Sequence, residues 1–185
     1  MKGTITTHTI AFAPGMGPGL LDRFLWEQLP LIARKMGEKE LILRIAPEKP
    51  FSQWHAALRT SKPFVQAYMD KLFARQSHFG IKTGFKERPG EGEIILQLPL
   101  AHADEFLSAN NIFLQACMPF LRVEASSFSV DFSKCDSSHL LVEGETRAME
   151  KFTAFVRNPK LLMEEKNKKK TKPRAKPPKK ARRKK

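Results

Sequence analysis

The side chains whose type and spacing most clearly indicate a chemical role are the cationic groups at the end of the sequence. Residues 166–185, KNKKKTKPRAKPPKKARRKK, contain 13 basic residues and no acidic residue. The basic positions are Lys166, Lys168, Lys169, Lys170, Lys172, Arg174, Lys176, Lys179, Lys180, Arg182, Arg183, Lys184 and Lys185. Ammonium and guanidinium groups at this density neutralise phosphates and release condensed counterions. We therefore predict that this basic tail binds an RNA backbone without reading its sequence.

The same composition leaves two other interpretations of the basic tail open. The tail has no apolar side chain larger than alanine apart from its prolines, so it cannot bury a core and is expected to be disordered on its own. A solvated tail that only increases solubility is one alternative. A nuclear localisation signal formed by the segment PPKKARRKK is the other.

Gly15, Gly17 and Gly19 form a glycine-rich turn between an expected strand and an expected helix. The P-loop pattern requires a lysine followed by serine or threonine, which is absent, and the third glycine comes one residue too early for a dinucleotide fingerprint. The free N–H groups of a helix N-terminus can nevertheless hold a phosphate, so these glycines are candidate phosphate contacts. The alternative is a tight turn that needs a positive φ.

The histidines and cysteines are too scattered to suggest catalysis or metal binding. No H-E-x-x-H, H-x-H or C-x-x-C spacing occurs. The residues concerned are His8, His55, His78, His102, His139, Cys117 and Cys135. We therefore predict a protein that is not an enzyme, with no catalytic residue, metal site, cofactor or small-molecule substrate.

Outside the basic tail, the composition is that of a nearly neutral globular body. The chain has 185 residues and a formal net charge of +14, from 33 basic and 19 acidic residues. Removing the tail leaves 20 basic and 19 acidic residues. With 41% hydrophobic residues and 14 phenylalanines, this body can bury a core. No apolar run approaches the roughly 20 residues that cross a bilayer, so we expect no membrane association through a spanning helix.

Local patterns predict a small mixed β-sheet with flanking helices, an α/β fold. The expected strands cover residues 4–13, 41–45, 80–87, 93–98 and 122–132, and the expected helices cover 20–36, 63–76, 101–117 and 145–156. The third and fourth strands form a hairpin around a Pro-Gly pair. Pro30 should kink or break the first helix, and Gly37 should cap it. The initial strand–helix–strand order predicts a right-handed parallel crossover.

The first segment resembles the thioredoxin-like domain shared by small mitochondrial ribosomal proteins and a small accessory subunit of respiratory complex I. The matching residues are Phe24-Leu25, Leu29-Pro30 and Ile32-Ala33, followed by the short apolar strand 41–45. The resemblance covers residues 4–118, with 47–79 as a helical insertion. It implies a scaffold without redox activity, because the thioredoxin active-site position, residues 14–19, contains no cysteine.

These features predict a structural constituent of a mitochondrial ribosome. A thioredoxin-like domain (residues 1–120) and an extension that packs on it (121–160) would contact ribosomal proteins and rRNA. The tail region (161–185) would neutralise rRNA phosphates. The expected location is the mitochondrial matrix, with the nucleus or nucleolus as the alternative. A nuclear nucleic-acid-binding protein and an accessory subunit of a respiratory complex are the rival functions.

Overall fold

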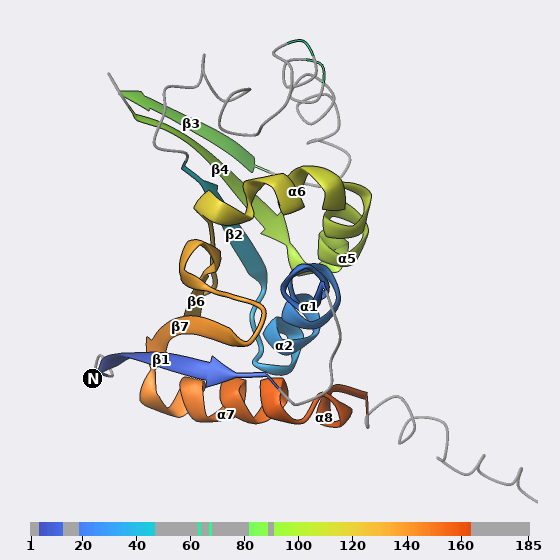
Figure 1. The fold of residues 1–185 in the computed structure, drawn as a ribbon, viewed down its shortest axis with the longest axis vertical. Helices are drawn as coiled ribbons and strands as arrows, with labels where there is room; N and C mark the ends of the chain where they lie inside the picture. The colour runs from blue at the N-terminus through green and yellow to red at the C-terminus, as the bar shows by residue number, and fades with distance from the viewer. Residues whose placement is uncertain are drawn as a thin grey trace, which may run out of the picture.

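An antiparallel sheet with helices packed against it makes up the described part of the chain (Figure 1). The structure is a computed structural model that describes residues 4–12, 19–46, 82–88 and 91–163, together with the single positions 63 and 67. The strands are β1 (Ile5–Ala11), β2 (Glu40–Ile45), β3 (Lys82–Arg88), β4 (Glu91–Pro99), β5 (Leu121–Glu124), β6 (Phe128–Asp131) and β7 (His139–Glu145). The helices are α1 (Leu20–Arg23), α2 (Leu29–Lys35), α5 (Leu100–Ala109), α6 (Asn111–Cys117), α7 (Thr146–Arg157) and α8 (Lys160–Met163), with a π-helical segment η1 (Phe24–Gln28) and the 3-10 turns η3 (Met118–Phe120) and η4 (Phe132–Lys134).

The arrangement of the strands differs from the mixed sheet that the sequence predicted. The order is β1-β7-β6-β5-β2-β4-β3, and every neighbouring pair is antiparallel. β1 and β2 therefore run in the same direction within one sheet, as the predicted crossover requires, but three strands lie between them. The predicted mixed sheet is wrong, because no two neighbouring strands of the described sheet are parallel. The reason is that β5, β6 and β7 follow one another through short connections, which favour antiparallel neighbours. Their outer members then pair with β2 and β1.

Residues 121–160 contribute three strands and a helix to the same sheet and core as the residues before them. β5, β6 and β7 occupy the middle of the sheet, and α7 contacts both β1 and β7. The boundary expected at residue 120 therefore falls inside a single sheet. The expected helical insertion at 47–79 lies outside the described residues, apart from the two single positions.

Alternation along the strands separates a core face from an open face. On β2, Leu41, Leu43 and Ile45 are fully buried, whereas Ile42 and Arg44 between them are half-buried. The buried face is covered by helices through a group of phenylalanines centred on Phe24, which is 0% exposed. Its ring lies 5.7 Å from that of Phe12, 6.4 Å from Phe132 and 6.3 Å from Phe152. These rings join η4, α7 and the residue after β1 to the first helix, so the first and last elements of the described residues share one core.

The first helix continues through Pro30 because its geometry changes just before that residue. Residues 24–28 form the π-helical segment η1, and the N–H of Leu29 donates to the carbonyl of Phe24. Pro30 then occupies one of the first positions of α2, where its missing N–H costs no hydrogen bond. The predicted disturbance at Pro30 is thus confirmed as a π-helical turn rather than as a break.

Three further elements correct the sequence predictions. The helix predicted at 101–117 is two helices, because Asn110 leaves helical geometry and its side-chain Nδ2 donates back to the carbonyl of Phe106 at 2.8 Å. The strand predicted at 122–132 is the hairpin β5–β6, whose turn lies at the phase slip in the apolar pattern. β7 was not predicted at all. The β3–β4 hairpin and α7 confirm their predictions.

Gly144 on β7 provides a direct test of this packing. An added Cβ would lie 2.5 Å from the backbone oxygen of Ser127 and 2.6 Å from the Cε of Met149. We expect Gly144→Ala to lower the free energy of unfolding by about 1–3 kcal/mol, as overpacking does elsewhere. Urea unfolding should show this loss, while Thr9→Ala on the exposed side of β1 should have little effect. An unchanged midpoint for Gly144→Ala would contradict the β6–β7 packing described here.

Candidate interaction surfaces

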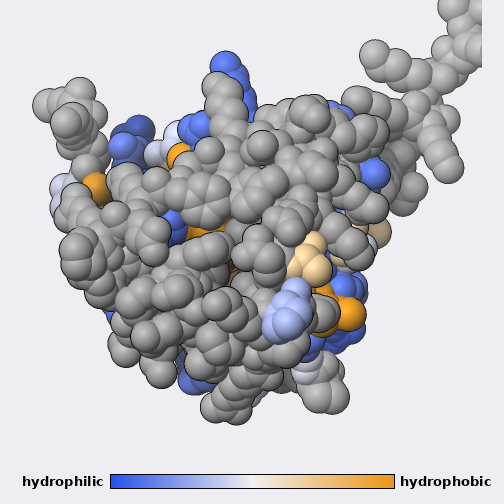
Figure 2. Space-filling model, turned by 90° about the horizontal axis from the view of Figure 1, so that it is seen from above, coloured by the Kyte–Doolittle hydropathy of each residue, from blue (hydrophilic) through white to orange (hydrophobic). Residues whose placement is uncertain are grey.

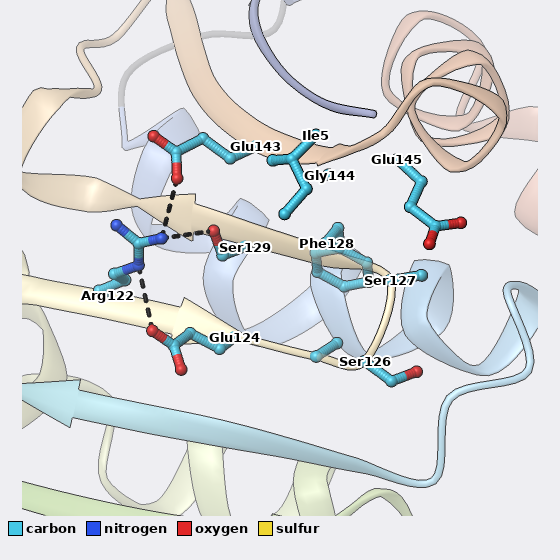
Figure 3. Close-up of a pocket in the computed structure, with 11 residues that line it drawn as sticks. Ile5, Arg122, Glu124, Ser126, Ser127, Phe128, Ser129, Glu143, Gly144 and Glu145 are labelled. Carbon is cyan, nitrogen blue, oxygen red and sulfur yellow. Dashed lines mark hydrogen bonds and ion pairs between the residues drawn. The ribbon is translucent and has the colours of Figure 1, made fainter. Parts of the chain in front are cut away.

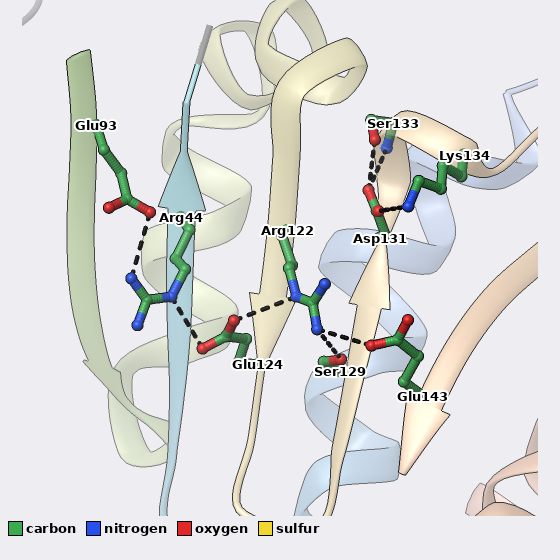
Figure 4. Close-up of polar contacts among 9 residues, drawn as sticks. All are labelled: Arg44, Glu93, Arg122, Glu124, Ser129, Asp131, Ser133, Lys134 and Glu143. Atoms are coloured by element: carbon green, nitrogen blue, oxygen red, sulfur yellow. Dashed lines mark hydrogen bonds and ion pairs between the residues drawn. The ribbon is translucent and has the colours of Figure 1, made fainter. Parts of the chain in front are cut away.

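A ladder of ion pairs crosses the open face of the sheet from β4 to β7 (Figure 4). Arg44 on β2 donates to Glu93 at 3.2 Å on one side and to Glu124 at 2.9 Å on the other. Arg122 on β5 donates to Glu143 on β7 at 2.9 Å. All of these side chains are between 24% and 37% exposed, so they are partly shielded from water. Linked pairs of this kind hold one another in place more firmly than an isolated surface pair does.

Glu124 is the central member of this ladder. Arg44 and Arg122 lie directly opposite each other across β2 and β5, an arrangement of like charges that by itself destabilises a sheet. Glu124 Oε2 accepts the hydrogen bond from Arg44, and its Oε1 lies 3.2 Å from Arg122 Nε, an ion-pair contact outside hydrogen-bond geometry. The hydrogen bond to Glu124 is the main cause that raises the pKa of Arg44. A carboxylate placed between the two arginines therefore offsets their mutual repulsion.

Between β4 and β7, the open face nevertheless carries an excess of negative charge. Its described side chains include four carboxylates, Glu93, Glu124, Glu143 and Glu145, against the two arginines of the ladder. Such a surface repels a phosphate backbone and favours a cationic partner. The sequence analysis did not identify these residues. Their alternation with apolar neighbours was visible, but the ladder joins residues 49 and 80 positions apart, and only the strand order brings them together.

A hollow of about 300 Å³ lies on the same face, beside the start of β1 (Figure 3). Its base is formed by the β5–β6 turn and by the end of β7. The lining residues are Ile5, Arg122, Glu124, Ala125, Ser126, Ser127, Phe128, Ser129, Glu143, Gly144 and Glu145. Carboxylates and hydroxyl groups surround a small apolar patch. This combination suits a cationic side chain with an aliphatic stem.

The shape of this hollow depends on the end of the first helix. Gly37 has φ +83°, and its N–H donates to the carbonyl of Arg34 at 3.1 Å. The N–H of Glu38 donates to the carbonyl of Ala33 at 3.0 Å. These two bonds form a Schellman motif with a left-handed glycine, which confirms the cap predicted at Gly37. The motif turns the chain so that Glu38 points at the β5–β6 turn.

Glu38 fixes that turn with both of its carboxylate oxygens. Oε2 accepts hydrogen bonds from the N–H of Ser126 at 3.0 Å and from its hydroxyl group. Oε1 accepts from the N–H of Ser127 at 3.1 Å and from its hydroxyl group. Burial alone would raise the pKa of Glu38, but the four hydrogen bonds from the two serines together lower it. The turn that lines the hollow is therefore held by an ionised carboxylate.

The cysteines do not form a reactive site. Cys117 and Cys135 are both free thiols. Burial raises the pKa of the Cys117 thiol strongly, and burial is also the main cause that raises the pKa of Cys135 to about 11. Both thiols therefore stay protonated at neutral pH, which makes them poor nucleophiles. Among the described residues no group of His, Cys, Asp and Glu has the arrangement of a metal site.

The structure places only one of the predicted site residues. Gly19 has φ +73° and lies at the N-terminus of α1, where its carbonyl accepts from the N–H of Arg23 at 3.0 Å. This agrees with the interpretation as a turn that needs a positive φ. Gly15, Gly17 and all 13 basic residues of the tail lie outside the described residues.

Replacing Glu38 by glutamine tests the clamp on the β5–β6 turn. Because the folded pKa of Glu38 lies below its ordinary value of 4.5, its contribution to stability is present above that value and is lost as the pH falls through the folded pKa. Glu38→Gln should therefore cost on the order of 1 kcal/mol at pH 7, given its partial exposure. The difference from the wild type should shrink between about pH 5 and pH 3.

Thermal unfolding at several pH values measures this difference, and Glu105→Gln on the exposed side of α5 is the matched control. A stability difference that stays constant from pH 7 to pH 3 would show that the carboxylate charge does not hold the turn.

Comparisons with known proteins do not assign the chain to a family. No family model, curated protein or solved structure matched the chain. In the part of the chain that the structure describes, no helix has both the length and the apolar character needed to cross a membrane.

Proposed function

We propose that the chain is a structural, RNA-binding component of a ribonucleoprotein particle, and specifically of a mitochondrial ribosome. Its basic tail binds rRNA phosphates, and its folded body contacts neighbouring proteins. It is not an enzyme and uses no cofactor. The observation that carries this proposal is the charge distribution, with 13 basic residues in 166–185 and a body of 20 basic and 19 acidic residues.

The geometry of the body supports this division of roles. An open sheet face with four glutamates and two arginines disfavours RNA, as argued above. The tail has 13 basic residues and no acidic residue, so none of its cations is offset by an acidic residue within the tail itself. An interface with RNA that depends on such contacts weakens steeply as salt increases. The RNA affinity of the whole protein should therefore reside in the tail.

The mitochondrial part of the proposal is supported by the sequence resemblance alone. The helix residues that carry the resemblance lie in the core, and three strands separate β1 from β2 in the sheet. We retain the ribosome of the matrix as the proposed location, together with rRNA and ribosomal proteins as partners.

A nuclear or nucleolar nucleic-acid-binding protein is the second candidate. The observation in its favour is the segment PPKKARRKK at 177–185, which has the composition of a nuclear localisation signal. An accessory subunit of a respiratory complex is less well supported, because an interface with protein has little use for 13 cations without acidic neighbours.

RNA binding by the tail can be measured with a variant in which all 13 basic residues of 166–185 are replaced by glutamine. Fluorescence anisotropy with a structured RNA fragment should give tight binding for the wild type at about 50 mM salt. Affinity should fall by about a thousand-fold or more at about 200 mM salt if roughly ten phosphates are contacted. The glutamine variant should lose nearly all affinity while its thermal unfolding stays unchanged.

A variant with the tail sequence shuffled is the matched control, because it keeps the charge and changes the order. It should bind as the wild type does, since phosphate contacts carry no sequence information. RNA affinity that survives in the glutamine variant would place the RNA-binding surface on the body and would contradict the proposal.

A further inference from the structure

β1 forms one free edge of the described sheet, with only β7 as a neighbour (Figure 1). The N–H of Phe12 donates to the carbonyl of Ser138 at 3.0 Å, which continues the β1–β7 ladder by one pair. Hydrogen-bonded and non-bonded pairs alternate in an antiparallel ladder. The residues Ile5, Thr7, Thr9 and Ala11 therefore direct their N–H and C=O groups away from β7, and all four are exposed.

This edge lacks the features that usually protect an edge strand. β1 pairs with β7 over seven consecutive positions without a bulge, and its sequence ITTHTIA contains no proline, lysine or acidic residue. The sequence of β3, at the other edge, is KTGFKER and includes four charged residues. An unprotected edge with β-branched residues is a template for an added strand.

Negative charge lies immediately behind this edge. Glu145 and Glu143 pair across the ladder with Ile5 and Thr7, and both line the hollow at the start of β1 (Figure 3). Glu143 already accepts from Arg122. The side chain of Glu145 is exposed and makes no hydrogen bond or ion pair with any described residue. A cationic side chain on an added strand would supply the missing partner.

We propose that the free edge of β1 binds an extended segment of another protein that carries lysine or arginine next to Glu145. The backbone of the segment pairs with the outward groups of Thr7 and Thr9, and its basic side chain enters the hollow beside Glu143 and Glu145. None of the residues that form this surface belongs to the basic tail, so peptide binding at the edge and RNA binding can be measured independently.

The charges of the edge argue against the other occupants. RNA would bring phosphates next to Glu143 and Glu145. A second copy of β1 offers no lysine or arginine to either glutamate. In the chain's own tail, Pro173, Pro177 and Pro178 cannot donate to a strand ladder, which disfavours residues 173–178 as the added strand. Residues 166–172 contain no proline, so the glutamine variant of the tail tests them as an occupant.

The probe for this proposal is a short synthetic peptide, Thr-Arg-Thr-Val-Thr-Arg-Thr, added to the full-length protein. Amide hydrogen exchange followed by NMR should show rapid exchange at Thr7, Thr9 and Ala11 in the free protein and slowed exchange with the peptide. The amides of Thr6, His8 and Ile10 should be protected in both states. A peptide with glutamate in place of arginine should bind at least about five-fold more weakly, because it meets like charge.

Two variants connect the binding to the edge. Thr7→Pro removes one outward donor and should abolish peptide binding, and a proline with its nitrogen facing away from the sheet is tolerated on an edge strand. Glu145→Gln, which leaves the backbone unchanged, should weaken binding by about two- to five-fold, as expected for an exposed ion pair. Glu105→Gln is the charge-matched control and should bind as the wild type does.

Several results would overturn the proposal. The edge would belong to a second copy if the outward amides of the free protein were protected in a concentration-dependent way. The edge would belong to the chain's own tail if the outward amides were protected in the free wild-type protein at every concentration and became unprotected in the glutamine variant of the tail. Protection by an RNA oligonucleotide would assign the edge to RNA. Equal affinity for the arginine and glutamate peptides would remove the role given to Glu143 and Glu145.

Discussion

The pairing of β7 with both β1 and β6 is the contact on which the rest of the structure depends. β7 is the only neighbour of β1, so without it the first strand would have no place in the described sheet. The same strand leads directly into α7, whose Phe152 packs against the ring of Phe128 at 4.9 Å and against that of Phe24 at 6.3 Å. Gly144 allows β7 to approach the β5–β6 turn closely. One strand thus links the beginning of the chain, the middle of the sheet and the last long helix of the described residues.

This arrangement leaves the two faces of the sheet with different roles. Helices cover one face of the sheet, and buried phenylalanines pack between them to form the core. The other face is polar, and its shape is set by the Glu38 clamp and by the ladder through Glu124. This face carries more carboxylates than arginines between β4 and β7, whereas the tail carries only positive charge. We infer that the body and the tail meet different partners, a cationic protein segment and RNA.

Local elements could be predicted from the sequence better than their arrangement. The Pro-Gly hairpin, the amphipathic helix α7 and the Gly37 cap are signalled by residues close together in the chain, and all three were predicted. The ion-pair ladder could not be predicted, since Arg44 and Glu124 meet only after β5 has paired with β2. β7 was missed because HLLVEGE is short and has a glycine and two glutamates among its apolar residues, which weakens the strand pattern. Because β7 was not predicted, the sequence did not indicate the strand that pairs with β1.

We propose that the protein is a component of a mitochondrial ribosome. Sedimentation of a tagged copy from purified mitochondria through a sucrose gradient tests it most directly, with the gradient run at low and at high salt. The account predicts migration with one ribosomal subunit at low salt, with mitochondrial rRNA in the same fractions, and partial release at high salt. Recovery of the tagged protein in the nuclear fraction, without mitochondrial rRNA, would contradict the account and would favour the localisation signal at 177–185 as the role of the tail.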